Sequence, residues 1–97
     1  MLDQLTLEDF TPLIGQTIAI RFGDNLHNAV VVQCQPGSGG RPGKRQPFSV
    51  IVRCGEPNRY WPQGIHTLVH PENGELELFL VPIGPDETGM RYEITFS

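Results

Sequence analysis

One short stretch, Arg59-Tyr60-Trp61-Pro62-Gln63-Gly64, holds the residue types best suited to recognise another molecule. Tyr, Trp and Arg are enriched among the residues that dominate binding energy at protein interfaces, and here they stand together beside a proline. The sequence predicts that Arg59, Tyr60 and Trp61 contact a protein partner. A second interpretation is that Trp61 plugs one end of a small barrel and pairs its indole N–H locally. The sequence favours neither of these two roles for Trp61.

The segment from Pro36 to Pro47, PGSGGRPGKRQP, gathers three of the seven basic residues: Arg41, Lys44 and Arg45. It superficially resembles a phosphate-binding loop, but Ser38 stands where that motif needs glycine, and Arg45 where it needs Ser or Thr. The match therefore fails. The segment is long for a hairpin connection, which predicts a flexible, solvated loop. The functional alternative is a basic arm that orders on an acidic partner or on phosphate.

Two histidines, His66 and His70, are four positions apart. On a helix this spacing could place both rings on one metal ion, whereas on a strand it separates them by roughly 13 Å. The residues around them are typical of a strand, so we expect partly buried structural histidines and no shared metal ion. No motif in the chain indicates a cofactor.

Two further pairs could carry catalysis. Cys34 and Cys54 are expected to face inward at opposite ends of one hairpin, too far apart for a disulfide, and to be small buried residues. Glu75 and Glu77 lie on one strand face, roughly 7 Å apart, which would suit paired-carboxylate chemistry. Exposed acidic residues are common on alternating strands, however, and no motif joins a cysteine to a histidine. We therefore expect no catalytic residues and no enzymatic activity.

The clearest structural signal is a hairpin, because two β-prone segments, 65–70 and 75–83, flank Pro71-Glu72-Asn73-Gly74. Asn-Gly predicts a tight turn, since both residues tolerate the positive φ that such a turn demands. Pro71 cannot donate to a ladder, so the first strand is predicted to end at His70. The second strand alternates at first and is then apolar on both faces, which predicts that its far half is covered on both sides.

Four other segments have the composition of strands: 17–22, 28–35, 48–54 and 90–96. In the second of these we expect Val30, Val32 and Cys34 to face inward. In the other three, alternation predicts these inward residues: Ile18, Ile20, Phe22, Phe48, Val50, Val52, Cys54, Tyr92, Ile94 and Phe96.

The N-terminal segment is predicted to form a short helix that starts after Thr6, because Glu8 and Asp9 suit the positive end of a helix dipole. Thr11 precedes a proline and is pushed away from the helical region, which keeps the helix short. Gly15 is expected to end it. Its apolar residues are expected to cover the sheet as a lid: Leu5, Leu7, Phe10, Leu13 and Ile14.

The chain of 97 residues is expected to form one domain, 1–97, because either half alone would be too small for a useful core. Its eleven Gly and nine Pro, about a fifth of the residues, are natural for a protein with many turns. The sequence therefore predicts an all-β fold: a small antiparallel barrel or rolled sheet of about six strands with a short N-terminal helix.

Charge and hydropathy exclude some classes of partner. The formal net charge of −4 argues against nucleic acid, which would need a basic surface. No apolar run approaches the roughly twenty residues of a transmembrane helix, and the acidic start MLDQLTLEDF lacks the features of a signal peptide. We expect no membrane contact, a cytoplasmic location and two reduced cysteines.

A family resemblance is carried by two stretches, LTLEDFTPLIGQ and YWPQGIHTLVHPENGELELFLVPIGPDETGMRYEITF. Its motifs are PQG-x-x-x-L-x-HP-x-x-G, LFLVPIGP and MRYE. They resemble a small uncharacterised bacterial domain family, a domain of unknown function, and the resemblance thins out between about Gly23 and Asn58. Its members are often encoded beside phage-tail-collar-like proteins. This implies an accessory or structural role in a tail-like or surface assembly. The family has no agreed activity, so the resemblance implies no catalytic residue.

These observations predict a non-enzymatic protein-interaction or structural accessory module that binds through the Arg59–Gly64 loop and the basic 36–47 arm. The alternative is a barrel that binds a small ligand or carbohydrate, with Trp61, Tyr60 and the histidines around its mouth. A pocket of roughly 300 Å³ or more beside Trp61 would favour the alternative, and a solid core would argue against it.

Overall fold

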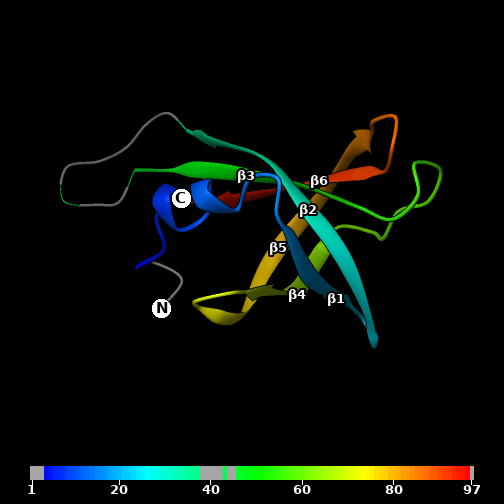
Figure 1. The fold of residues 1–97 in the computed structure, drawn as a ribbon, viewed down its shortest axis with the longest axis horizontal. Coiled ribbons are helices and arrows are strands. Elements are labelled where there is room, and N and C mark those ends of the chain that lie inside the picture. Colours follow the sequence, from blue (N-terminus) through cyan, green and yellow to red (C-terminus); the bar gives the residue numbers. More distant parts are fainter. Residues whose placement is uncertain (1–3, 38–42, 44–45, 97) are drawn as a thin grey trace.

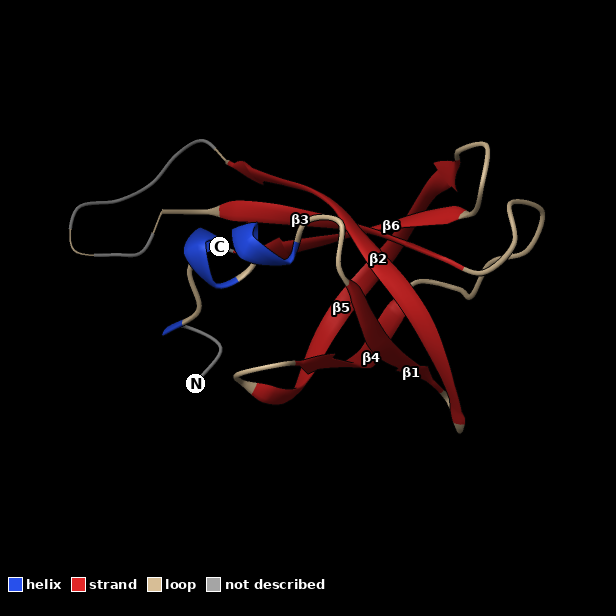
Figure 2. Cartoon of the chain, in the orientation of Figure 1, coloured by secondary structure: helices blue, strands red, loops and turns tan. Residues whose placement is uncertain are grey.

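The protein is described by a computed structural model over residues 4–37, 43 and 46–96, and most of this backbone is β-strand (Figures 1 and 2). The strands are β1 (Thr17–Phe22), β2 (Asn25–Pro36), β3 (Phe48–Cys54), β4 (Gly64–His70), β5 (Gly74–Pro85) and β6 (Met90–Phe96). They pair antiparallel in the order β1-β2-β3-β6-β5-β4, and β1 also pairs with β4. The all-β prediction is confirmed, and the closed sheet is a barrel rather than an open rolled sheet.

Side chains fill the barrel interior. The inward residues predicted for β1, β3 and β6 are all at most 5% exposed. Leu68 of β4 and the leucines of β5 complete the same cluster. A small barrel filled in this way leaves space for a ligand only at its ends.

The β4–β5 hairpin forms at the predicted place, with His70 opposite Gly74 and Pro71–Asn73 as the loop. Gly74 has φ of 75°, whereas Asn73 does not adopt a positive φ. The turn therefore needs the conformational freedom of glycine at one position only, in a longer loop than a two-residue Asn-Gly turn would give.

The prediction that the far half of β5 is covered on both faces is wrong. Leu76, Leu78 and Leu80 point into the barrel, but Phe79 between them is 50% exposed on the outer wall. The barrel has a single sheet, so a residue whose neighbours point inward must point outward. The apolar Phe79 stands on a face that no described element covers.

The prediction for β2 is also wrong in its start and in two inward residues. The strand begins at Asn25, and the buried side chains are Ala29 and Val31, not Val30 and Val32. A register shift between Val31 and Gln33 then turns Cys34 toward the core. Such a β-bulge inserts one residue and exchanges the two faces of the strand beyond it.

The N-terminal segment is a lid made of two 3₁₀ turns, η2 (Leu7–Asp9) and η3 (Thr11–Leu13), at one end of the barrel (Figure 2). The first turn follows Thr6 as predicted, and it is capped by the Asp9 carboxylate, which accepts the backbone N–H of Thr6 over 2.8 Å. Phe10 is completely buried, but Ile14 is 43% exposed and does not join the lid packing that we expected.

His70 joins the lid to the β4–β5 hairpin. Its Nδ1 accepts the backbone N–H groups of Glu72 and Asn73, each at 3.1 Å, so its proton lies on Nε2 and is donated to the carbonyl of Asp9 over 2.7 Å. The side chain is 1% exposed. His70 is therefore a structural residue, fully rather than partly buried.

The β5–β6 loop is held by the carboxylate of Asp86. Its Oδ1 accepts the N–H groups of Thr88 at 2.8 Å and Gly89 at 3.0 Å, and its Oδ2 accepts Arg53 Nη1 at 3.1 Å. These bonds, that of the Thr88 N–H foremost, lower the pKa of Asp86 from 3.8 to about 2. Gly89 has no room for a side chain, because a Cβ would lie 2.8 Å from the Gly55 carbonyl oxygen.

We expect Asp86→Asn to remove a pH-dependent part of the stability. The folded pKa lies below the ordinary value, so the charged carboxylate stabilises the fold above about pH 3.8 and this contribution is lost as the pH falls to about 2. Urea unfolding of both proteins at several pH values measures the effect. The stability difference between wild type and Asp86→Asn should shrink toward the acid end, and a constant difference would contradict the assignment.

Candidate functional site

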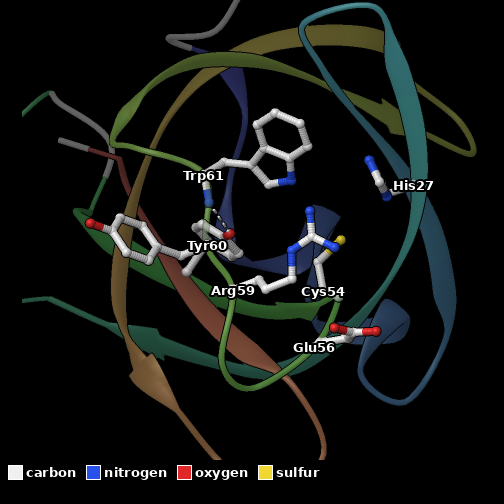
Figure 3. A pocket seen from close by; sticks show the side chains of 8 residues that line it. His27, Cys54, Glu56, Arg59, Tyr60 and Trp61 are labelled. Atoms are coloured by element: carbon white, nitrogen blue, oxygen red, sulfur yellow. Dashed lines mark hydrogen bonds between the residues drawn. The ribbon is translucent and has the colours of Figure 1, made fainter.

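The end of the barrel opposite the lid is an open mouth, bounded by the connection from β3 to β4. Phe48 and Cys54 mark the two ends of β3: Phe48 packs against Phe10 of the lid, and Cys54 lines a pocket at the mouth. This pocket has a volume of about 380 Å³ (Figure 3). Its lining residues are His27, Cys54, Gly55, Glu56, Arg59, Tyr60, Trp61 and Tyr92.

Trp61 is fixed at the mouth by the core below it. Its ring stacks on Phe22 with centroids 5.4 Å apart and planes 5° from parallel, and its backbone N–H donates to the Tyr92 hydroxyl over 2.9 Å. Trp61 therefore plugs the barrel end and is partly buried, but its indole N–H does not find the expected local partner among the described residues. It also lines the pocket, so the two roles considered for Trp61 are compatible.

Arg59 and Tyr60 lie on the rim. Arg59 N donates to the Glu56 carbonyl at 3.2 Å, which closes a turn, and the Arg59 guanidinium reaches over the pocket (Figure 3). Among the described residues, no carboxylate lies within ion-pair distance of it. Tyr60 is 64% exposed and its ring points away from the pocket centre (Figure 3).

His27 was not predicted to take part in any site. Its ring packs 5.8 Å from Phe22 and 5.7 Å from Trp61, and its Nε2 atom is buried without a hydrogen-bond partner in the described part of the chain. Buried polar atoms are normally paired, because an unpaired one loses its bond to water. His27 therefore has an unmet hydrogen bond at the wall of the pocket.

Two further titratable groups at the wall, the Cys54 thiol and the Tyr92 hydroxyl, have raised pKa values that keep them neutral. Burial raises the pKa of the Cys54 thiol, which donates to the Asn28 carbonyl over 3.3 Å. Burial, more than any other cause, also raises the pKa of Tyr92, whose oxygen accepts the Trp61 N–H. A thiol in this environment is a poor nucleophile, because the thiolate is the reactive form. The lining is suited to binding.

Neither His66 nor His70, the two histidines discussed from the sequence, lines the pocket. His70 is in the lid end, and His66 does not line the pocket, although its ring contacts Phe22 at 4.7 Å and its Nε2 lies 3.3 Å from the Pro62 carbonyl. The mouth histidine is His27. Within the residues described, no group of three or more His, Cys, Asp or Glu is arranged to hold a metal ion.

The remaining candidates are separate from the mouth. Glu75 pairs with Arg21 at 3.3 Å on the outer wall. Cys34 and Cys54 are free thiols, opposite Val50 and Ala29 respectively, so they stand at different levels of the β2–β3 ladder. Arg41, Lys44 and Arg45 of the predicted basic arm lie outside the described residues.

Residues 5–96 match the model of a protein family described as "Domain of unknown function (DUF6916)". The chain belongs to this family. The match to DUF6916 also spans 23–58, where we expected the resemblance to thin out, and it includes both the lid and the mouth. No curated protein and no solved structure matches the chain. No helix of the described chain is long and apolar enough to cross a membrane.

Proposed function

We propose that this protein is a non-enzymatic protein-interaction module whose contact surface is the mouth, formed by Arg59, Tyr60 and Trp61. The observation that carries the proposal is a rigid aromatic anchor beside an exposed one. Trp61 is already ordered by Phe22 and Tyr92, so little conformational entropy is lost when a partner covers it. Tyr60 offers its exposed ring next to it.

The proposal extends to the setting of the module. The family resemblance, with members encoded beside phage-tail-collar-like proteins, supports a structural accessory role in a bacterial tail-like or surface assembly.

A tagged pull-down from native cell lysate, read by mass spectrometry, tests the proposal. Recovery of tail-like or surface-assembly proteins is expected, and Tyr60→Ala or Trp61→Ala should reduce it by about 30-fold, the equivalent of a hot spot of about 2 kcal/mol. Tyr60→Ala is the cleaner variant, because an exposed side chain contributes little to folding.

Phe79→Ala is the matched control, since Phe79 is also an exposed aromatic but lies on the outer wall. Its pull-down is expected to equal that of the wild type. If Phe79→Ala lost the partner and Tyr60→Ala kept it, the mouth would not be the contact surface.

A second candidate is a small-ligand or carbohydrate-binding barrel, and the pocket itself favours it. Its volume of about 380 Å³ beside Trp61 is within the range of ligand sites, though near the lower end. The filled core below argues against a ligand inside the barrel and leaves only the mouth for this candidate. Recovery of the bait alone, together with a thermal shift by a small molecule, would favour this candidate over the first.

A further inference from the structure

Three nitrogen groups without a partner among the described residues line the mouth pocket. They are the buried Nε2 of His27, the guanidinium of Arg59 and the indole N–H of Trp61. In Figure 3 the indole nitrogen, the guanidinium and the imidazole face the same region of the pocket. Of the other polar side chains of the wall, the Cys54 thiol donates to the Asn28 carbonyl and the Tyr92 oxygen accepts the Trp61 N–H.

A set of this kind calls for a ligand that accepts several hydrogen bonds. Guanidinium and indole groups can only donate, and imidazole donates from one nitrogen in its neutral form. A carboxylate offers about four acceptor positions and matches the planar fork of an arginine. The ligand atom group that satisfies the donors best is therefore a carboxylate.

The charge and the wall residues of the pocket restrict the class of ligand further. Glu56 lies on the same rim as Arg59, so the rim carries one positive and one negative side chain. A single negative charge is accommodated there more easily than the double charge of a phosphate monoester. The rings of Trp61 and Tyr92 and the volume of about 380 Å³ suit one compact, flat apolar group.

We propose that the mouth pocket binds a singly charged carboxylate attached to a compact aromatic or apolar group, with Arg59 and Trp61 as its hydrogen-bond donors. The proposal rests on the mouth being the binding surface, and names what is recognised there. The carboxylate could belong to a free organic acid or to the C-terminal residue of a partner chain, since both present the same atoms.

Trp61 is the single tryptophan of the sequence, so its fluorescence reports on the pocket directly. Phenylacetate is the free-acid probe and phenylacetamide its neutral control. A short peptide ending in phenylalanine, with a free or an amidated C-terminus, is the second pair. We expect the acid of at least one pair to bind about 10- to 100-fold more tightly than its amide, the range for a charge-assisted hydrogen bond. Binding of the first acid identifies a small molecule as the source, and binding of the peptide alone identifies a partner's C-terminus.

Arg59→Gln and its control Arg21→Gln test whether the fluorescence change of Trp61 comes from acid bound in the pocket. Arg59→Gln should abolish the preference for acid over amide. Arg21→Gln changes the net charge equally at an exposed site on the outer wall and should keep that preference. His27→Phe keeps a ring of similar shape without the unmet nitrogen, so it should raise the melting temperature of the free protein.

Equal binding of acids and amides, no binding of any probe, or an unchanged preference in Arg59→Gln would overturn the carboxylate proposal. None of these results would affect loss of a protein partner by Tyr60→Ala in the pull-down. Failure of the carboxylate proposal and failure of the interaction proposal are therefore distinguishable.

Discussion

Phe10→Ala is expected to lower the free energy of unfolding by about 3–5 kcal/mol, the range for deletion of a buried phenylalanine ring. Phe10 is 0% exposed, and its ring lies 6.1 Å from Phe48, 5.3 Å from Phe96 and 5.2 Å from His70. Phe10 is the buried apolar side chain through which the lid closes its end of the barrel. Urea unfolding can be monitored by the fluorescence of Trp61, which lies at the other end of the barrel. This measures whether Phe10→Ala destabilises the whole barrel.

Two controls belong to this experiment. Phe79→Ala removes the same side chain from a half-exposed position and should cost no more than about 1 kcal/mol. Phe10→Leu keeps much of the buried volume and should lie between wild type and Phe10→Ala. If Phe10→Ala cost no more than Phe79→Ala, the lid would not be part of the cooperative fold.

The strands that could be predicted from the sequence are those with one polar and one apolar face. In 17–22 and 90–96 the alternation identifies both the bounds and the buried side, because only one register buries the apolar set. In 48–54 the polar Ser49 and Arg53 mark the outer face, although Ile51 on that face is also buried. In β2, three consecutive valines put apolar residues on both faces, and a bulge follows them. No local pattern says which face is inner in such a strand.

The candidate site was only partly predictable for a different reason. The residues of one contiguous loop, Arg59 to Trp61, could be recognised by type. His27 and Tyr92 join them only because β1 pairs with β4 and β3 pairs with β6, and these long-range pairings are not visible in local spacing. The predicted start of β2 at Asn28 also left His27 outside any strand.

His70→Ala is the second large effect, again about 3–5 kcal/mol, but with a polar cause. It leaves the Asp9 carbonyl without its donor and the N–H groups of Glu72 and Asn73 without their acceptor, and it opens a cavity beside Phe10. Unpaired buried groups cost about 1–3 kcal/mol each, and because these three groups are only partly buried, access to water keeps the loss below the full sum. Thermal or urea unfolding measures the loss.

Two milder variants separate the two functions of the imidazole. His70→Asn can keep an acceptor near the hairpin N–H groups, and His70→Gln can keep a donor near the Asp9 carbonyl, so each should retain part of the stability. Phe10→Ala and His70→Ala should also be non-additive: because the rings touch, the double variant should lose less than the sum by about 0.5–3 kcal/mol. Additive losses would mean that lid and hairpin are stabilised independently, and that His70 does not couple them.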